Sequence, residues 1–104
     1  FATPVLKGRE WTSEVLHVDD FGNIITNITH KNLGKIEAKR QRFLTVKFKN
    51  KKLKIRFCKA YGEVAVGDIL ALIGSHDFLE IAVNQGNASK KLKTKTGDVL
   101  KVSF

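Results

Sequence analysis

The sequence predicts an all-β fold, a small closed or nearly closed antiparallel β-barrel of about seven short strands with one or two short helical turns. Apolar residues with a period of two recur in short runs along the 104 residues, and glycine-containing turns separate the runs. No segment keeps a helical period long enough for an α/β fold. Closing the sheet into a barrel would also remove its exposed edges.

The first predicted hairpin lies near the start of the chain. Apolar and polar side chains alternate over 12–19, which predicts a strand, and the β-branched run within 23–27 favours a second strand. Gly22 lies in the turn between them, where it can adopt a positive φ. Thr29 is then positioned to cap a short helical turn that ends at Gly34.

The remaining elements follow at regular intervals. A hairpin turning at Asn50 is expected next, and Asn87 is positioned to cap a short helix near the C-terminus. Strands are expected over 43–49, 53–58, 66–73 and 78–83 and from 96 onward, and the helix is expected over 88–92.

The formal net charge is +9, and most of the 19 basic residues lie between Lys35 and Lys59, where Glu37 is the only acid. Such a charge distribution can attract nucleic acid, so the alternative function is a basic β-barrel module that binds RNA or DNA and is not an enzyme. Within 43–58, however, lysines alternate with apolar residues, as in a half-buried hairpin with a solvated outer face. No exposed aromatic stripe accompanies them, so the pattern favours the solvated face.

The chain is predicted to be one domain over 11–104, preceded by an incoming linker over 1–10. Cys58 is the single cysteine, which excludes an internal disulfide and favours a reducing, cytoplasmic location. No Cys/His cluster has metal-ligand spacing. Because the chain begins at Phe1 and has no methionine, we expect it to be a piece of a longer protein.

The turn 19–23 concentrates three kinds of recognition chemistry. Asp19 offers a carboxylate, Phe21 an aromatic face and Asn23 a primary amide. Together they suit a ligand with an ammonium group, a flat ring and a donor–acceptor edge. The alternative is that Asp19 and Asn23 only cap the turn and Phe21 fills the core.

Two further polar turns, 74–77 and 84–87, flank the strand predicted at 78–83. They are expected at opposite ends of that strand, which argues against one compact catalytic triad. No serine lies in a nucleophile elbow and no glycine-rich phosphate loop is present. The residues therefore indicate a binding domain, and no catalytic residue is assigned.

Three motifs resemble one enzyme family. Val-Asp-Asp-Phe-Gly-Asn at 18–23, Tyr61, and Gly-Ser at 74–75 followed by Phe-Leu-Glu-Ile-Ala-Val-Asn at 78–84 are similar to the C-terminal domain of the S-adenosylmethionine hydroxide adenosyltransferases. These hydrolases are related to fluorinase and chlorinase. The similarity extends in matching order over about 14–102.

The resemblance implies an S-adenosyl-L-methionine hydrolase that forms adenosine and L-methionine with water as the nucleophile. In that family an N-terminal α/β domain precedes the barrel, and the ligand lies between that domain of one subunit and the barrel of its neighbour in a homotrimer. S-adenosylmethionine is then the substrate, and no cofactor or metal is implied. Because the residues that activate water belong to the other domain, we expect this chain to be inactive alone.

The resemblance also implies a role for each motif residue. Asp19 and Ser75 would bind the methionine ammonium, the backbone at His76 its carboxylate, and Asn23 the adenine edge. Adenine would pack on the aromatic side chains of Phe21 and Tyr61. It would also lie close to the backbone of Gln85. The sequence departs from the family pattern at Asp20, where a basic residue is frequent, and at His76, where halogenating members have arginine.

Overall fold

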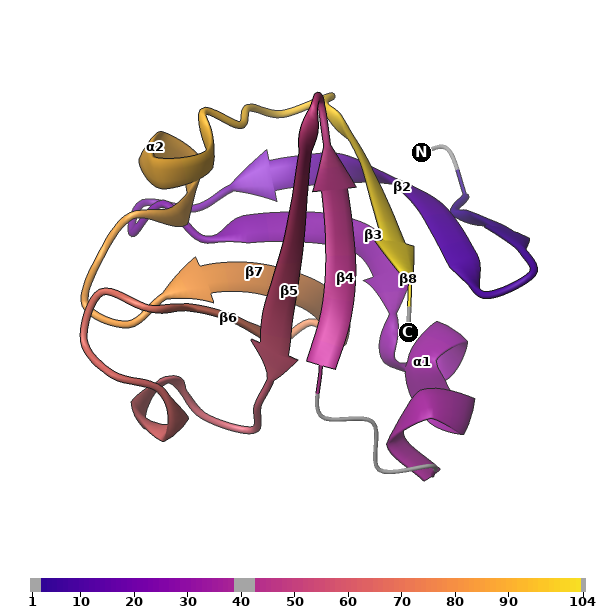
Figure 1. Cartoon of the computed structure of the whole chain (residues 1–104), viewed down its shortest axis with the longest axis horizontal. Helices are drawn as coiled ribbons and strands as arrows, with labels where there is room; N and C mark the ends of the chain where they lie inside the picture. Colours follow the sequence, from indigo (N-terminus) through magenta and orange to yellow (C-terminus); the bar gives the residue numbers. More distant parts are fainter. Residues whose placement is uncertain (1–2, 39–42, 104) are drawn as a thin grey trace.

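The computed structural model describes residues 3–38 and 43–103. Seven strands close a barrel in the order β2-β3-β7-β6-β5-β4-β8, because β8 also pairs with β2 (Figure 1). The all-β barrel predicted from the sequence is thus confirmed. The strands are β1 (Val5–Lys7), β2 (Glu10–Val18), β3 (Ile24–Thr29), β4 (Phe43–Phe48), β5 (Lys51–Phe57), β6 (Ile69–Ile73), β7 (Phe78–Val83) and β8 (Val99–Ser103). The helices are α1 (His30–Ala38), α2 (Ala88–Leu92) and the 3-10 turn η1 (Tyr61–Glu63).

Among the strand pairs of the described residues, only β5–β6 is parallel, and the others are antiparallel. Arg56 pairs with Leu70 and Phe57 with Ala71. The long connection 58–68, which contains η1, returns the chain so that β6 runs in the same direction as β5. The prediction of an antiparallel barrel is corrected at this pair.

The predicted helix ending at Gly34 is wrong, because α1 continues to Ala38. Gly34 does not have the positive φ of a helix-ending glycine. The start of α1 is capped as expected, since Asn32 N donates to Thr29 Oγ1 at 3.2 Å and Thr29 N donates to Asn32 Oδ1 at 2.8 Å. The segment 1–10, expected as a linker, contains β1, which pairs with the start of β2.

The predicted limits of β7 and α2 are confirmed. Asn87 is the N-cap of α2, and its Oδ1 accepts a hydrogen bond from Lys90 N at 2.9 Å. Lys93, in the left-handed conformation, follows the helix and donates its N–H to Lys90 O.

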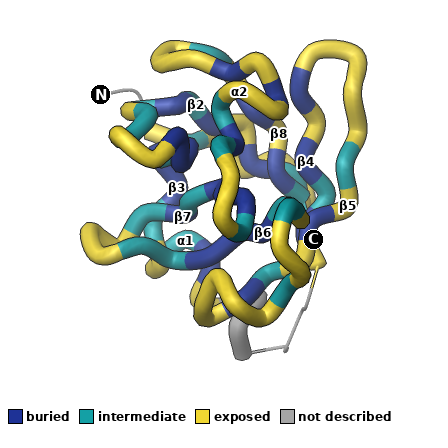
Figure 2. The backbone as a smooth tube through the Cα atoms, turned by 90° about the vertical axis from the view of Figure 1, so that its left-hand side faces the viewer, coloured by how far each residue is buried: buried dark blue, intermediate teal, exposed yellow. Residues whose placement is uncertain are grey.

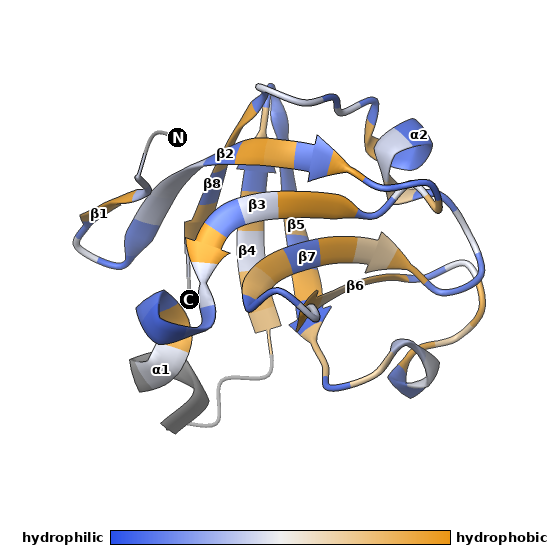
Figure 3. Cartoon of the chain, turned by 180° about the vertical axis from the view of Figure 1, so that it is seen from behind, coloured by the Kyte–Doolittle hydropathy of each residue, from blue (hydrophilic) through white to orange (hydrophobic). Residues whose placement is uncertain are grey.

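The core fills the barrel, and a second apolar layer covers the outside of β6 and β7. Alternate residues of β2, β4 and β8 point inward and are buried. Leu70, Leu72 and Ala82 instead pack outward against Cys58 and Val64. Figure 3 accordingly shows β6 and β7 as mainly hydrophobic. This outer layer holds the connection 58–68, and thus η1, against the barrel.

None of the helices in the described part of the chain is long and apolar enough to cross a membrane. The β2–β3 turn and α2 lie together at one end of the barrel, and α1 lies at the other end (Figures 1 and 2). The predicted site residues are grouped mainly at the first of these ends.

Candidate functional site

The β2–β3 turn is organised by the Asp19 carboxylate. Its Oδ1 accepts hydrogen bonds from Phe21 N and Asn23 N, both at 2.9 Å, and its Oδ2 accepts from Asn23 Nδ2 at 3.0 Å. The backbone closes the turn, since Asp19 N donates to Asn23 O and Gly22 N donates to Asp19 O. A carboxylate has about four lone-pair positions, and the turn uses three of them. One position therefore remains for a ligand.

Asn23 joins this turn to η1. Its side chain is buried, and Nδ2 donates both to Asp19 Oδ2 and, more weakly at 3.4 Å, to Tyr61 Oη. With both amide hydrogens engaged, Oδ1 is the atom of Asn23 that can accept from a ligand. The structure thus brings Tyr61, which is distant in sequence, together with Asp19 and Asn23 of the turn.

Phe21 does not fill the core, because 77% of its surface is exposed. Tyr61 is also not a core residue, at 41% exposed. The alternative proposed for Phe21 is therefore wrong, although Asp19 and Asn23 do cap the turn. Two aromatic faces are left accessible beside a carboxylate and an amide.

Glu80 adds a second carboxylate that the sequence analysis did not select. It lies on β7, and its carboxylate occupies the space above Gly74 that a Cβ at that glycine would fill. Burial and the negative charge of Asp19 raise the pKa of Glu80, while His76 acts in the opposite direction. Burial, then Glu80 and Asp19, likewise raise the pKa of Tyr61. The signal in the sequence was a single acid within the apolar strand 78–83.

Glu80 also relates the turn 74–77 to the turn 19–23. The turn 74–77 carries Ser75 and His76, both exposed, and it lies at the start of β7 as predicted. The Glu80 side chain reaches back over Gly74, and the negative charge of Asp19 helps to raise its pKa. The carboxylate therefore links the turn 74–77 electrostatically to the turn 19–23.

The loop 84–87 packs directly on the β2–β3 turn. A Cβ at Gly22, whose φ is +83°, would overlap the Asn87 side chain, and Ser89 N donates to Gly22 O at 2.9 Å. Gln85 lies exposed on this loop with a positive φ of 54°. The end of the barrel thus combines the turn 19–23, η1 and the loop 84–87.

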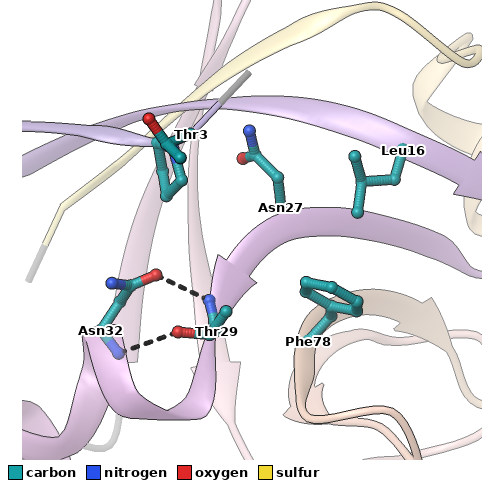
Figure 4. A pocket seen from close by; sticks show the side chains of 7 residues that line it. Thr3, Leu16, Asn27, Thr29, Asn32 and Phe78 are labelled. Carbon is teal, nitrogen blue, oxygen red and sulfur yellow. Dashed lines mark hydrogen bonds between the residues drawn. The ribbon is translucent and has the colours of Figure 1, made fainter. Parts of the chain in front are cut away.

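A separate hollow of about 320 Å³ lies near α1 (Figure 4). It is lined by Leu16, Asn27, Thr29 and Phe78, among others. Asn27 is buried, and its Oδ1 accepts from Glu14 N at 3.0 Å. None of the predicted site residues lines this hollow, so it is distinct from the cluster around Asp19.

The fold and this cluster define a small β-barrel with a polar, aromatic-rimmed end assembled from three loops. Residues 13–101 match the model of the SAM hydroxide adenosyltransferase C-terminal domain, where SAM is S-adenosylmethionine. The chain therefore belongs to this family, as the resemblance of its motifs indicated.

Curated relatives and solved structures agree with this assignment. The chain is 32% identical over 105 residues to the (R)-S-adenosyl-L-methionine hydrolase of Methanocaldococcus jannaschii, a match that covers 96% of this chain and 38% of that protein. It is 34% identical to the enzyme of the same name from Thermus thermophilus, over 81% of this chain and 29% of that protein. The crystal structure of an uncharacterized conserved protein from Thermotoga maritima superposes with a TM-score of 0.91 at 36% identity, over 99% of this chain and 39% of that one. The chain thus spans well under half the length of these relatives.

The raised pKa of Glu80 predicts a pH-dependent stability. An unfolded glutamate ionises near pH 4.3, whereas folding favours the protonated form of Glu80. The stability due to this group is therefore complete below the unfolded pKa and is lost as pH rises through the folded pKa. Glu80→Gln should match the wild type at pH 4 and be more stable at pH 7, measured as urea midpoints.

Glu14→Gln, on the outer face of β2, controls for removing a carboxylate elsewhere. Gly74→Ala provides an independent displacement of the Glu80 carboxylate, because the added methyl group occupies its position. A Glu80→Gln curve parallel to the wild-type curve from pH 4 to 7 would contradict the assignment.

Proposed function

We propose that this chain is the adenosine- and methionine-binding C-terminal domain of an S-adenosyl-L-methionine hydrolase, which converts S-adenosyl-L-methionine and water to adenosine and L-methionine. The observation that carries the proposal is the cluster of Asp19, Asn23, Tyr61 and Phe21 at one end of the barrel. The hydrolase names of the curated relatives support the reaction. In the proposed enzyme an N-terminal α/β domain of a neighbouring subunit in a homotrimer completes the site, and the location is cytoplasmic.

The cluster presents different chemical groups to the two ends of the ligand. The Asp19 carboxylate has one acceptor position left for the ammonium group, and Glu80 adds negative charge beside it. The exposed Phe21 and Tyr61 rings are available to pack on adenine. In this arrangement Ser75 and the His76 backbone bind the amino-acid half, and the Gln85 backbone lies near the adenine.

Adenine recognition by Asn23 follows from its hydrogen bonds. Because Nδ2 donates to Asp19 and Tyr61, Oδ1 faces the ligand as an acceptor. It can accept from the exocyclic amino group of adenine but would oppose the carbonyl oxygen of hypoxanthine. The site should therefore bind adenosine more tightly than inosine.

This selectivity can be measured by calorimetric titration of the full-length protein. We expect adenosine to bind more tightly than inosine by about 1–3 kcal/mol, and Asn23→Ala to abolish most of that difference. Asn50→Ala, at the exposed tip of the β4–β5 hairpin, should leave it unchanged. Equal affinities for the two nucleosides in the wild type would place the adenine site elsewhere.

The reaction itself is tested by chromatography of products from S-adenosylmethionine. The full-length protein should release adenosine and methionine in equal amounts, while the 104-residue chain alone should release neither. Release by this chain alone would show that it contains its own water-activating residues. A folded full-length protein that releases no adenosine would refute the hydrolase proposal.

A further inference from the structure

The outer side of β5, β4 and β8 carries a concentrated positive charge, and we call this surface the basic face. Cross-strand register places Lys52 opposite Lys47, and Lys47 opposite Lys101. All three lysines are exposed, so they form one row across three strands. Neighbouring strands are about 4.8 Å apart, and like charges directly opposite each other destabilise a sheet. Folding alone therefore does not favour this row.

Little negative charge compensates the basic face. Lys47 Nζ lies 3.1 Å from Glu10 Oε2, at the β2 edge. Lys54 and Arg56 extend the positive charge along β5. Arg56 Nη1 donates to Glu63 O at 3.1 Å, and its charge acts on the Glu63 carboxylate, so Arg56 is partly compensated. Among residues 3–38 and 43–103, no ion pair other than Lys47–Glu10 neutralises the face. Most cations of the basic face can therefore pair with an anionic partner that carries several charges.

The same face holds an exposed aromatic ring and hydroxyl groups. Phe43 pairs with Arg56, is 45% exposed, and its ring centroid lies 4.7 Å from Lys54 Nζ. The partly exposed Thr45 and Ser103 lie opposite each other between the cations. Hydroxyl groups, lysines and arginines are the usual partners of phosphate oxygens. An aromatic face beside a basic track is what unpaired bases require for stacking.

A hollow of about 590 Å³ continues this surface from Phe43, Lys54 and Arg56 toward Lys91. The acidic residues Glu63 and Asp68 also line it, so we assign the phosphates to the row of lysines and only a base to the hollow. Its volume lies within the range of ligand pockets, roughly 300–1,000 Å³. It begins at the aromatic end of the basic face, where a base that leaves the row of lysines could enter.

We propose that the basic face binds single-stranded nucleic acid. Successive phosphates lie along Lys52, Lys47 and Lys101, and a base stacks at Phe43. Clustered cations also attract anionic lipids, but the hydroxyl groups between the cations and the exposed ring of Phe43 fit phosphates joined to bases better than lipid headgroups. The sequence pattern had favoured a solvated face because it showed no exposed aromatic stripe, and the exposed Phe43 is the feature that changes this conclusion.

The test is fluorescence anisotropy of labelled oligo(dT) and oligo(U) of about 12 nucleotides with the 104-residue chain. If the five cations of the basic face each neutralise a phosphate, the affinity should fall roughly a hundredfold between about 50 and 200 mM salt. Replacing Lys47, Lys52 and Lys101 by alanine should reduce the salt slope by about 2. Phe43→Ala should weaken binding about tenfold with little change in slope.

The matched control replaces Lys31, Lys59 and Lys90, exposed lysines outside the basic face, by alanine. It should retain the wild-type salt slope. Absence of oligonucleotide binding at 50 mM salt, an equal loss in the control, or binding to phosphatidylserine vesicles without binding to oligonucleotides would each overturn the proposal. Removing the like charges should not lower the melting temperature, so unfolding does not confound the comparison. The hydrolase proposal is not required for this inference, and each can fail without the other.

Discussion

Gly22→Ala is expected to lower the melting temperature by at least about 8 °C. The substitution places a Cβ at a φ of +83° and into the Asn87 side chain. Strain at such a φ and overpacking together cost about 2–5 kcal/mol, and each kcal/mol shifts the melting temperature by roughly 4–8 °C in a domain of this size. Thermal unfolding followed by circular dichroism measures the change.

Gly97→Ala separates the two causes. Gly97 has a similar φ of +91°, but a Cβ there would meet no atom within 4 Å. Its substitution should therefore report backbone strain alone and lower the melting temperature by less. Equal effects of the two substitutions would mean that Asn87 moves aside at no cost and that the β2–β3 turn is not tightly packed against it.

Gly22→Ala should also weaken ligand binding in the full-length protein. The substitution separates the turn 19–23 from the loop 84–87, and both belong to the proposed site. Gly97, at the turn into β8, lies outside that site, so Gly97→Ala provides the matched control for affinity as well. Unchanged adenosine affinity in a folded Gly22→Ala variant would contradict the proposed role of this contact.

The strands of this fold were predictable because their signals are local. Alternation of apolar and polar residues depends only on which face meets the core, and it predicted a strand over 43–49, where β4 spans Phe43–Phe48. The parallel pairing of β5 with β6 was not predictable, since it depends on the path of the connection 58–68. The predicted helix end at Gly34 was wrong for a related reason: the low helix propensity of glycine is a weak signal that tertiary context overrides.

The candidate site was predictable in its residue types but not in its connections. The turn 19–23 is a contiguous motif, so its carboxylate and amide were visible in the sequence. The hydrogen bond from Asn23 to Tyr61 joins residues 38 positions apart, and no periodicity reports it. Glu80 escaped selection because a partly buried acid in a strand becomes significant only when its neighbours, Asp19 and Gly74, are known.

Asp19→Asn should weaken S-adenosylmethionine binding to the full-length protein ten- to a hundredfold relative to adenosine. An ammonium paired with a carboxylate contributes about 1.5–3 kcal/mol, which corresponds to that range of affinity. The new amide can still accept from Phe21 N and Asn23 N through its oxygen. Its nitrogen, however, would face Asn23 Nδ2, where Asp19 Oδ2 now accepts at 3.0 Å, and two donors would oppose each other.

The Asn23 amide can relieve this conflict by turning over, which would alter adenine binding as well. The informative quantity is therefore the ratio of the affinities for S-adenosylmethionine and adenosine, because both ligands carry adenine and the change at Asn23 cancels. Asp20→Asn removes an exposed carboxylate from the same turn and should leave the ratio unchanged. If Asp19→Asn lowers the melting temperature but also leaves the ratio at its wild-type value, Asp19 acts only as a turn cap and the ammonium must bind elsewhere.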